Sequence, residues 1–461
     1  MSRRALLPLL LVAACAGMRA GRTREVRLTH GVAVGETTDT HAVVWARCEA
    51  PAVLEVTVDG QAPRRAGVEA KHDLTQRIVL DGLAPGAEHA YRVRCGNGPA
   101  LSGRFRTAPP PSDAAAVRFA FGGDVGGQNV CRDAARGYPI FAAMAERAPD
   151  FFVALGDMVY ADGTCLPVGA LGNAQVAGPP PASDVESYRA HWRYNRAHAA
   201  SQRLLASTTY YAVWDDHEVR DDFGPPQELY EAGEAAYRDW APMGDAAPLH
   251  RSFRWGRHVE LFILDTRSHR DPNAAPDTGP DPKTLLGPAQ RAWLEAGLSA
   301  STATWKVVVS SVPMSIPTGG SARDGWANGG GPDGFERELV AILRSAARAR
   351  VRGLVWITTD VHFATGFRYR PFPDAPDFVV HEIASGPLAA GMFPKGDLDR
   401  TLRPERLFMH GPRAGQRPIS FDAALQWFNF GLVEVDADGR LEATIVDATG
   451  RPRHRLTLAA P

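Results

Sequence analysis

An apolar, strand-like segment of this chain runs without a break into a cluster of ionisable side chains. The segment reads YYAVWDDHEVRDDFG over residues 210–224, and the cluster begins with Asp215, Asp216, His217 and Glu218. A carboxylate that folds into a protein interior costs several kcal/mol unless a cation or hydrogen bonds compensate its charge. Any fold of this chain must therefore bring compensating positive charge to the end of this strand.

Three further strand-like segments end in a similar way. VRFAF is followed by Gly123-Asp124, FFVAL by Gly156-Asp157-Met158-Val159-Tyr160, and LVWITT by Asp360-Val361-His362. Taken alone, each has a plain explanation as a turn, a helix cap or a structural histidine. Together, at the carboxyl ends of strands in one sheet, they would place like charges within a few ångströms and so require cations. The sequence therefore predicts a metal centre.

The hydrophobic pattern divides the chain into two parts. Residues 26–108 contain short alternating runs such as LEVTVDG and AYRVRC, which predict an antiparallel β-sandwich. LDGLAPGAEHAYRVRC resembles the turn and tyrosine-corner strand of fibronectin type III domains. Beyond the proline-rich residues 109–116, continuous apolar runs alternate with helical segments, which predicts buried strands covered by helices in an α/β domain. We expect the Gly- and Pro-rich stretches 163–184 and 318–334 to be long loops that border the site.

Charge and length exclude some classes of function. The 461 residues exceed what one hydrophobic core usually organises, so two domains are expected. Lys and Arg number 51 against 52 Asp and Glu, and this balance lacks the basic footprint of a nucleic-acid-binding protein. We therefore expect small-molecule substrates, no nucleic acid partner and a monomer.

The first 24 residues are typical of an export signal. Ser2-Arg3-Arg4 precedes an apolar run of roughly a dozen residues, too short for the about 20 that cross a bilayer as a helix. The arginine pair resembles a twin-arginine signal, and Val12-Ala13-Ala14-Cys15 resembles the lipobox of bacterial lipoproteins. We expect an exported protein, a periplasmic or cell-envelope lipoprotein acylated on Cys15; the alternative is a plain cleaved signal and a secreted protein.

The remaining four cysteines suit an oxidising compartment. Cys48, Cys95, Cys131 and Cys165 permit three connectivities. Cys48 and Cys95 both lie on strand-like runs in the first hundred residues, so we expect these two to pair with each other and Cys131 to pair with Cys165.

The order of the strand-end motifs is that of a known superfamily. GDxG, GDxxY and two modified histidine boxes resemble the calcineurin-like metallophosphatases, notably the purple acid phosphatases. WDDHE, LFILDTRSHRD, WKVVVSSVPM, RDGWANGGGPDGFEREL, TTDVH, EIASGPL and the N-terminal GVAVGETTDTHAVVWAR more closely resemble the PhoD alkaline phosphatase family. The likeness covers nearly the whole chain after the signal. It implies a four-layer α/β/β/α metallophosphatase sandwich at 117–461, preceded by a linker at 109–116 and a small fibronectin III-like sandwich at 25–108.

The resemblance also implies roles for individual residues. Asp124, Asp157, Tyr160 and His362 would surround a first metal, and Asp157 would bridge to a second held by Asp216 and Asp360. A phenolate ligand suits iron(III) at the first position, and oxygen-rich ligands at the second suit calcium, or zinc, manganese or magnesium. The catalytic residues would be His217, as general acid towards the leaving group, and Asp216. Glu218 would orient His217, and Asp215 would be a further ligand or a brace.

Two departures from the family pattern bear on the metals. PhoD members usually have a cysteine where this chain has Asp124, and VVVSSVPM supplies Ser310 and Ser311 where calcineurin-like enzymes have a histidine. A nitrogen-poor second site favours calcium. Cys131 is an alternative thiolate ligand, although the disulfide to Cys165 is the favoured expectation in an exported protein.

These residues predict an exported metal-dependent phosphatase that hydrolyses phosphate monoesters. A hydroxide bridging two metals would attack phosphorus directly, without a phosphoenzyme. The alternatives are a phosphodiesterase or phospholipase D-like hydrolase with the same centre, and a non-catalytic surface module. Arg220, Arg267 and Arg132 are candidates for gripping phosphate, and Tyr369 and Trp326 for lining the pocket, although ion pairing and core packing are the commoner roles of such residues.

Overall fold

The structure is a computed structural model that describes residues 25–244, 248–319, 323–328, 334–393, 396–413, 416 and 418–461. The expected export signal and Cys15 lie outside the described residues. Within the described ranges, no helix combines the length and the apolar character that a membrane span requires.

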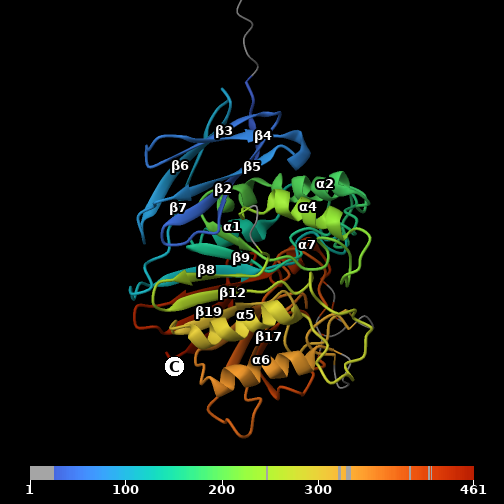
Figure 1. Cartoon of the computed structure of the whole chain (residues 1–461). Coiled ribbons are helices and arrows are strands. Elements are labelled where there is room, and N and C mark those ends of the chain that lie inside the picture. The colour runs from blue at the N-terminus through green and yellow to red at the C-terminus, as the bar shows by residue number, and fades with distance from the viewer. Residues whose placement is uncertain are drawn as a thin grey trace, which may run out of the picture.

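Two mixed β-sheets packed face to face form the centre of the molecule (Figure 1). The first sheet has nine strands in the order β20-β19-β18-β8-β9-β10-β1-β2-β5. Their bounds are β1 Leu28–Gly35, β2 His41–Cys48, β5 Thr75–Asp81, β8 Val117–Gly122, β9 Phe151–Ala154, β10 Thr209–Ala212, β18 Asn429–Val435, β19 Leu441–Asp447 and β20 Pro452–Leu458.

The second sheet has seven strands in the order β11-β12-β13-β14-β16-β15-β17. Their bounds are β11 Arg251–Trp255, β12 Val259–Ile263, β13 Trp305–Val309, β14 Leu354–Thr358, β15 Ala364–Tyr369, β16 Val380–Ala384 and β17 Pro404–His410. Side chains such as Phe119 and Val153 of the first sheet meet Val307 and Ile357 of the second in one buried core.

Helices cover the outer face of each sheet (Figure 1). The helices are α1 Pro139–Ala145, α2 Val185–Arg196, α3 Ala199–Leu205, α4 Tyr230–Trp240, α5 Gly287–Ala300, α6 Glu336–Arg348 and α7 Phe421–Ala424, with a 3-10 turn at Ala70–His72. Trp192 of α2 and Tyr237 of α4 pack in the core outside the nine-stranded sheet. Leu294 of α5 and Ile342 of α6 pack in the core outside the seven-stranded sheet. The layer order is therefore α/β/β/α.

Parallel pairing brings the carboxyl ends of the central strands together. β8, β9 and β10 are parallel neighbours in the first sheet, and β12, β13, β14 and β16 are parallel neighbours in the second. Every residue of β9, β10, β13 and β14 is buried, as the continuous apolar runs predict for strands covered on both faces. The polar residues that follow these strands therefore gather at one edge of the two-sheet core.

The N-terminal strands form the expected sandwich, but one of its sheets continues into the first central sheet. A separate four-stranded sheet in the order β4-β3-β6-β7 packs on β1, β2 and β5; its bounds are β3 Ala52–Val58, β4 Arg64–Val68, β6 Glu88–Cys95 and β7 Leu101–Arg106. Only two residue pairs, Val34 with Thr209 and Gly35 with Tyr210, join β1 to β10. Alternation along a strand does not reveal its neighbour, so this junction was not predicted. The division of the chain at residues 109–116 stays a prediction.

Both expected disulfides are present. Cys48–Cys95 joins β2 to β6 across the N-terminal sandwich, with a Cα–Cα distance of 5.9 Å. Cys131–Cys165 joins two loops, with a Cα–Cα distance of 5.8 Å. Cys131 is therefore committed to a disulfide, and the alternative role as a thiolate ligand was wrong.

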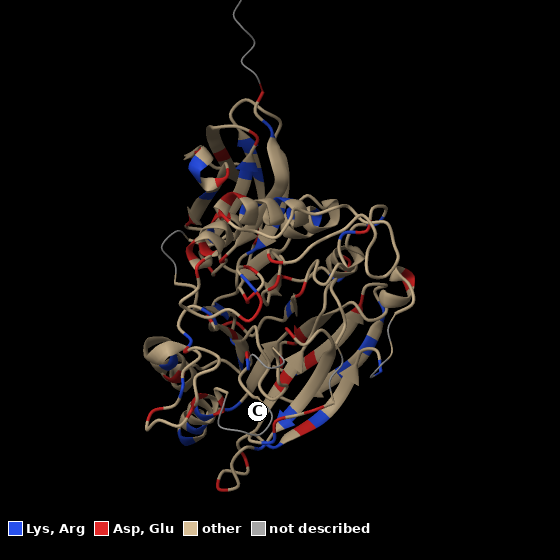
Figure 2. Ribbon diagram, turned by 90° about the vertical axis from the view of Figure 1, so that its right-hand side faces the viewer, with Lys and Arg blue, Asp and Glu red and all other residues tan. Residues whose placement is uncertain are grey.

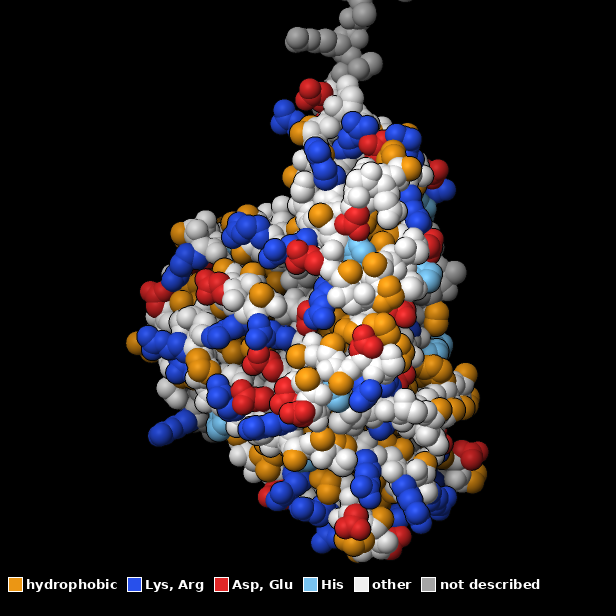
Figure 3. Space-filling view, turned by 90° about the vertical axis from the view of Figure 1, so that its left-hand side faces the viewer, with side chains coloured by type: hydrophobic (Ala, Val, Ile, Leu, Met, Phe, Trp, Pro, Cys, Tyr) orange, Lys and Arg blue, Asp and Glu red, His pale blue; other side chains and the backbone are white. Residues whose placement is uncertain are grey.

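The surface charge matches the composition. Basic and acidic side chains are interspersed over the face shown in Figure 3, and the formal net charge is -1. Interspersed charges of both signs favour solubility and do not form the single-sign field that steers a polyanion.

Candidate metal centre

Acidic loops gather at the edge where the central strands end. In the view of Figure 2, Asp and Glu residues lie on loops near the middle of the molecule, between the helices and the strands. Asp124 follows β8, Asp157 follows β9, Asp216 follows β10 and Asp360 follows β14. Parallel pairing of β8 with β9 and of β9 with β10 brings three of these loops side by side. The fold therefore brings the strand-end motifs to one place.

The backbone at these motifs adopts an unusual conformation. Asp124, Asp157, Asp360 and His362 have φ values of 66°, 51°, 72° and 58°, in the left-handed region. Residues other than glycine rarely occupy this region, and each costs of the order of 1 kcal/mol or more. The surrounding structure therefore holds all four residues in an unfavourable backbone conformation. Such clustering of strain is typical of functional sites.

Two groups of potential ligands share one residue. The first group is Asp124, Asp157 and His362, and the second is Asp157, Asp216 and His217; in each group the donor atoms lie within 4.8 Å of one another. Asp157 belongs to both groups. A carboxylate has two oxygens, so one residue can serve two ions. Asp360 lies outside both groups.

Buried oxygens without partners indicate what belongs in this space. Among the described residues, no hydrogen bond reaches the following side-chain oxygens, all of which are buried: Asp124 Oδ1, Asp215 Oδ2, Asp216 Oδ1 and Asp360 Oδ2. A buried carboxylate oxygen without a donor is costly, and most buried polar atoms in proteins are paired. Cations would satisfy such oxygens at Asp124, Asp216 and Asp360. The donor set therefore fits metal ions.

The pKa values of these carboxyl groups are raised in the absence of cations. Burial is the main cause and raises the pKa of Asp124 to about 8 and that of Asp215 to about 7. Burial and the charge of Asp216 together raise the pKa of Asp157 well above its ordinary value. For Asp360, burial and then the charges of Asp215 and Asp216 have the same effect. Bound cations would offset both the burial of these charges and their mutual repulsion.

His362 presents one ring nitrogen to the first group. Its Nδ1 donates to the Gly391 carbonyl oxygen at 2.6 Å, which leaves the Nε2 lone pair facing the centre. His362 Nε2 lies 2.9 Å from the Tyr160 hydroxyl and 3.5 Å from Asp124 Oδ1. The Tyr160 phenol oxygen thus lies next to the donor atoms of the first ligand group. The expected association of Asp124, Asp157, Tyr160 and His362 is present in the geometry.

Glycine allows the Tyr160 ring to fit. The Tyr160 and His217 ring centroids are 4.1 Å apart. A Cβ atom added at Gly127 would lie 2.5 Å from Tyr160 Cζ, so the glycine backbone lies directly against the ring. The phenol is therefore held between a histidine and a backbone that no larger residue could provide.

His217 is held by a carboxylate that the sequence interpretation did not include. Its Nδ1 lies 2.8 Å from Asp162 Oδ1 and its Nε2 lies 3.6 Å from Asp221 Oδ1. Burial alone would lower the pKa of His217, but the charges of Asp216, Asp162 and Asp221 outweigh burial and raise it to about 10. An imidazole held at Nδ1 and protonated at Nε2 is suited to donate a proton.

Glu218 does not orient His217 as expected. Its carboxylate instead accepts hydrogen bonds from the backbone N–H groups of Asp157, Met158 and Asp215, at 2.8–3.0 Å. Glu218 is completely buried and ties the loop after β9 to the loop after β10. Glu218 therefore fixes the positions of these two loops relative to each other. The carboxylate that contacts His217 is that of Asp162.

Arg267 compensates the negative charge of Asp215. It is completely buried, and its Nε lies 2.6 Å from Asp215 Oδ1. Its Nη atoms donate to both oxygens of Asp324 and to the Phe223 carbonyl oxygen. Ser311 Oγ also donates to Asp215, at 2.8 Å. These contacts make Asp215 a brace, and they occupy Arg267, so it cannot grip phosphate.

The other side chains proposed around the substrate lie elsewhere. Arg220 is exposed, and Arg132 donates to the Tyr194 carbonyl oxygen at 2.7 Å. Tyr369 and Trp326 are completely buried in the core outside the seven-stranded sheet. Trp326 donates to Ser310 Oγ, and Tyr369 donates to Glu382. Tyr369 and Trp326 pack in the core and do not line a pocket.

Two further residues support Asp124. Thr359 Oγ1 donates to Asp124 Oδ2 at 2.6 Å. Gly386 has a φ of 145°, and a Cβ atom added there would lie 2.4 Å from Asp124 Oδ2 and 2.7 Å from Thr359 Oγ1. The TTDVH and EIASGPL segments contain these residues, but only the folded chain shows that they meet at Asp124.

Gly386→Ala is expected to lower the affinity for the first ion by about 10- to 100-fold, because the new methyl group must displace a ligand or the threonine that supports it. Metal titration of the purified variant measures this. Gly67→Ala, where a Cβ would meet nothing within 4 Å, is the control and should keep the wild-type affinity. Unchanged affinity in Gly386→Ala would show that Asp124 is not a ligand.

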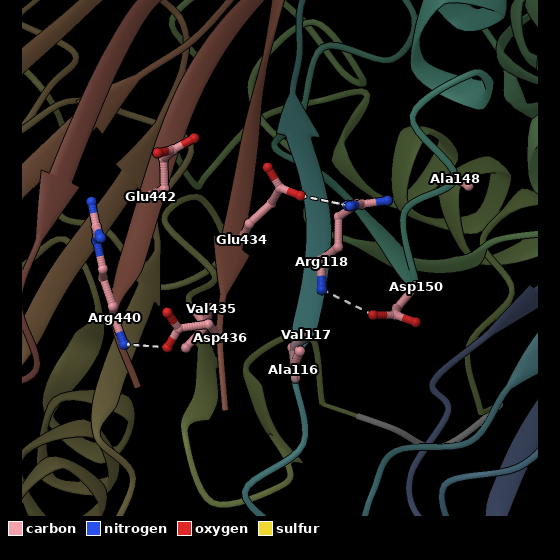
Figure 4. Close-up of a pocket in the computed structure, with 10 residues that line it drawn as sticks. All are labelled: Ala116, Val117, Arg118, Ala148, Asp150, Glu434, Val435, Asp436, Arg440 and Glu442. Carbon is pink, nitrogen blue, oxygen red and sulfur yellow. Dashed lines mark hydrogen bonds and ion pairs between the residues drawn. The ribbon is translucent and has the colours of Figure 1, made fainter. Parts of the chain in front are cut away.

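A hollow of about 500 Å³ lies at the opposite end of β8 and β18 (Figure 4). In it, Arg118 contacts Glu434 at 2.7 Å, and the Arg118 backbone N–H donates to Asp150 at 2.9 Å. None of the strand-end acidic motifs lines this hollow, so it is not part of the candidate metal centre.

Comparisons with known proteins agree with the fold. A family model described as PhoD-like phosphatase matches residues 119–444, and one described as PhoD-like phosphatase, N-terminal domain, matches residues 14–109. Alkaline phosphatase D of Bacillus subtilis (strain 168) is 26% identical over 388 residues, which are 72% of this chain and 64% of that protein. The chain thus matches less than two thirds of the length of this relative.

Solved structures confirm the predicted fold class. "Structure of PhoD" superimposes with a TM-score of 0.73 at 19% identity, covering 94% of this chain and 89% of that one. The purple acid phosphatase PPD1 from yellow lupin (Lupinus luteus) seeds gives a TM-score of 0.60 at 14% identity, covering 94% and 74%. At these identities the likeness shows the fold alone. The family models cover most of the sequence, and the chain belongs to the PhoD-like phosphatase family.

Proposed function

We propose that this chain is an exported, metal-dependent phosphatase that hydrolyses phosphate monoesters. The observation that carries the proposal is the position of Asp157 in two ligand groups whose other carboxylates have buried oxygens that no hydrogen bond reaches among the described residues. Two cations that share a carboxylate form the arrangement used to cleave phosphoesters. The names of the related proteins support the same reaction class.

Each ion has a proposed set of ligands. Asp124, Asp157, Tyr160 and His362 would hold the first ion, and a phenolate with carboxylates suits iron(III). Asp157 and Asp216, with Asp360 nearby, would hold the second, and an oxygen-rich set suits calcium, or zinc, manganese or magnesium. When bound, two such cations lower the pKa of water towards about 7 and neutralise charge on the phosphoryl oxygens.

The side chains of this protein would supply the remaining steps. His217 Nε2–H would protonate the departing ester oxygen as its bond to phosphorus breaks, so that the alcohol leaves neutral. Asp162 would keep the imidazole ring in place through Nδ1. Glu218 and Arg267 would hold the loops and Asp215 in position without contacting the substrate.

Export is part of the proposal. The N-terminal sequence is typical of a signal, and the two disulfides require an oxidising compartment to form and persist. We propose a periplasmic or cell-envelope lipoprotein acylated on Cys15, or a secreted protein if the signal is simply cleaved. The proposed partners are small phosphoesters, and the proposal includes no nucleic acid.

A comparison of two substrates tests the reaction. Metal-loaded protein is expected to hydrolyse 4-nitrophenyl phosphate with a higher kcat/KM than bis(4-nitrophenyl) phosphate. Faster hydrolysis of the diester would identify a phosphodiesterase or phospholipase D-like hydrolase with the same centre. No hydrolysis of either ester by metal-loaded protein would favour the non-catalytic surface module.

A further inference from the structure

Three exposed hydrophobic side chains lie on two loops that meet at Gln128 and Asn129. Among the described residues, seven large hydrophobic side chains are prominently exposed, and these include Phe393, which follows Gly391, and Leu166 and Val168, whose loop is bonded to Asn129. Leu166 is 53% exposed, Val168 63% and Phe393 47%. Single exposed hydrophobic residues are normal, but several on adjoining loops at a candidate active site indicate a binding surface.

Phe393 lies against a proposed metal ligand. Its ring centroid is 5.1 Å from that of His362. Gly391, whose carbonyl oxygen accepts the hydrogen bond from His362, also makes room for the phenylalanine: a Cβ atom added there would lie 2.9 Å from Phe393 Cζ. The same Cβ would lie 3.0 Å from Gln128 Oε1. The ring is therefore folded back over Gly391, between His362 and Gln128.

The loop that carries Leu166 and Val168 is fixed to the same region. Asn129, the neighbour of Gln128, donates to the Val168 carbonyl oxygen at 3.1 Å and accepts from the Leu166 backbone N–H at 2.9 Å. The Cys131–Cys165 disulfide closes this loop immediately before Leu166. Hydrophobic side chains on a loop tied in this way are presented in a fixed arrangement, which lowers the entropy cost of binding.

The opposite side of the centre is acidic. Beyond His217 lie Asp162, Asp221 and Asp222, and the side chain of Asp221 is 70% exposed. Their negative charge would repel an anionic leaving group. A row of rings, His217, Tyr160, His362 and Phe393, leads from this side to the hydrophobic one, with neighbouring centroids 4.1, 6.3 and 5.1 Å apart.

We propose that Phe393, Leu166 and Val168 form a specificity surface that binds an apolar ester group, so that the substrates are phosphoesters of apolar alcohols with an extended alkyl chain. The inference rests on the proposed function of the same centre and names its substrate class. The alkyl chain would extend from the ester oxygen towards Phe393, Leu166 and Val168.

A series of n-alkyl phosphates from methyl to octyl tests the surface, because these leaving alcohols differ little in acidity and differ mainly in apolar length. We expect kcat/KM for octyl phosphate to exceed that for methyl phosphate by about tenfold, the equivalent of roughly two fully buried methylene groups. The gain should increase with chain length and be largest for octyl phosphate. The octyl-to-methyl ratio should fall towards one in Phe393→Ser and in the Leu166→Ser/Val168→Ser double variant.

The ratio separates specificity from folding and metal content, because both substrates use the same centre. The double variant does not touch His362, so its loss of preference cannot come from a disturbed ligand. Leu101→Ser, at a 40% exposed leucine on β7, is the control and should keep the wild-type ratio.

Hydrolysis of methyl phosphate with a ratio near one in the wild type would overturn the specificity surface and leave the proposed function intact. If neither an alkyl phosphate nor 4-nitrophenyl phosphate is hydrolysed, the proposed function fails. Calorimetric binding of octyl and methyl phosphonate then decides on the surface: tighter binding of the octyl compound supports it, and equal binding overturns it.

Discussion

Asp157→Asn is expected to abolish binding of both ions and to reduce phosphatase activity at least about 1,000-fold, a loss of roughly 4 kcal/mol of transition-state stabilisation. The amide has the size of the carboxylate but lacks its charge, and Asp157 is the residue that the two ligand groups share. Elemental analysis of the purified variant, together with kcat/KM, measures both effects.

Asp73→Asn is the matched control for this change. Asp73 is also a buried aspartate, 6% exposed, but Arg47, Arg193 and Trp240 donate to its oxygens. This variant should keep its metals even if its thermal stability falls. Loss of only one ion in Asp157→Asn would contradict the shared ligand, and retention of both ions would remove Asp157 from the site.

His217→Asn is expected to lower kcat by about 10²- to 10⁴-fold for an alkyl phosphate, because the departing alkoxide loses its proton donor. The loss should be much smaller for 4-nitrophenyl phosphate, whose leaving group is acidic and departs without a proton. This dependence on the leaving group distinguishes a general acid from a metal ligand, whose removal would slow both substrates alike.

Asp162→Asn tests the positioning of the histidine. Without the Asp162 charge the imidazolium form is less stable, so the pKa of His217 falls and the alkaline limb of the kcat profile moves to lower pH. His41→Asn, at a histidine paired with Asp81 at 3.1 Å on the N-terminal sandwich, should change neither the profile nor kcat. An unchanged pH profile in Asp162→Asn would exclude the orienting role of the carboxylate.

The parts of the site that the sequence predicted are those with a local signal. Asp124, Asp157, Asp216 and His362 each follow an apolar run, and parallel strands place such residues at one edge regardless of the details of packing. The disulfide pairing could likewise be predicted from the sequence. Four cysteines allow three pairings, and two of the four lie together in the N-terminal region.

The parts that the sequence did not predict depend on contacts between distant segments. Asp162 reaches His217 across 55 positions, and Gly386 reaches Asp124 from another sheet. Glu218 adjoins His217 in the chain, yet its side chain points to the backbone of Asp157 and Met158. Adjacency along the chain suggested the wrong partner, because the direction of a side chain is decided by the packing around it.

The junction between the N-terminal sandwich and the first central sheet has the same origin. Residues 26–108 contain every strand signal that a separate sandwich would show, and only the pairing of β1 with β10 makes the sheet continuous. This contact consists of only two residue pairs, Val34 with Thr209 and Gly35 with Tyr210, and no sequence pattern reveals it.

The central claim is that the buried carboxylates at the carboxyl ends of β8, β9 and β10 enclose two cations that share Asp157. The most direct test is a crystal structure of protein purified through its own export route, with anomalous scattering recorded at the absorption edges of the candidate metals. We predict two ions, one contacting Asp124, Tyr160 and His362, the other contacting Asp216, and both contacting Asp157. A structure prepared with ample metals that shows no ion there, and hydrogen bonds or water in place of the unpaired oxygens, would contradict the account.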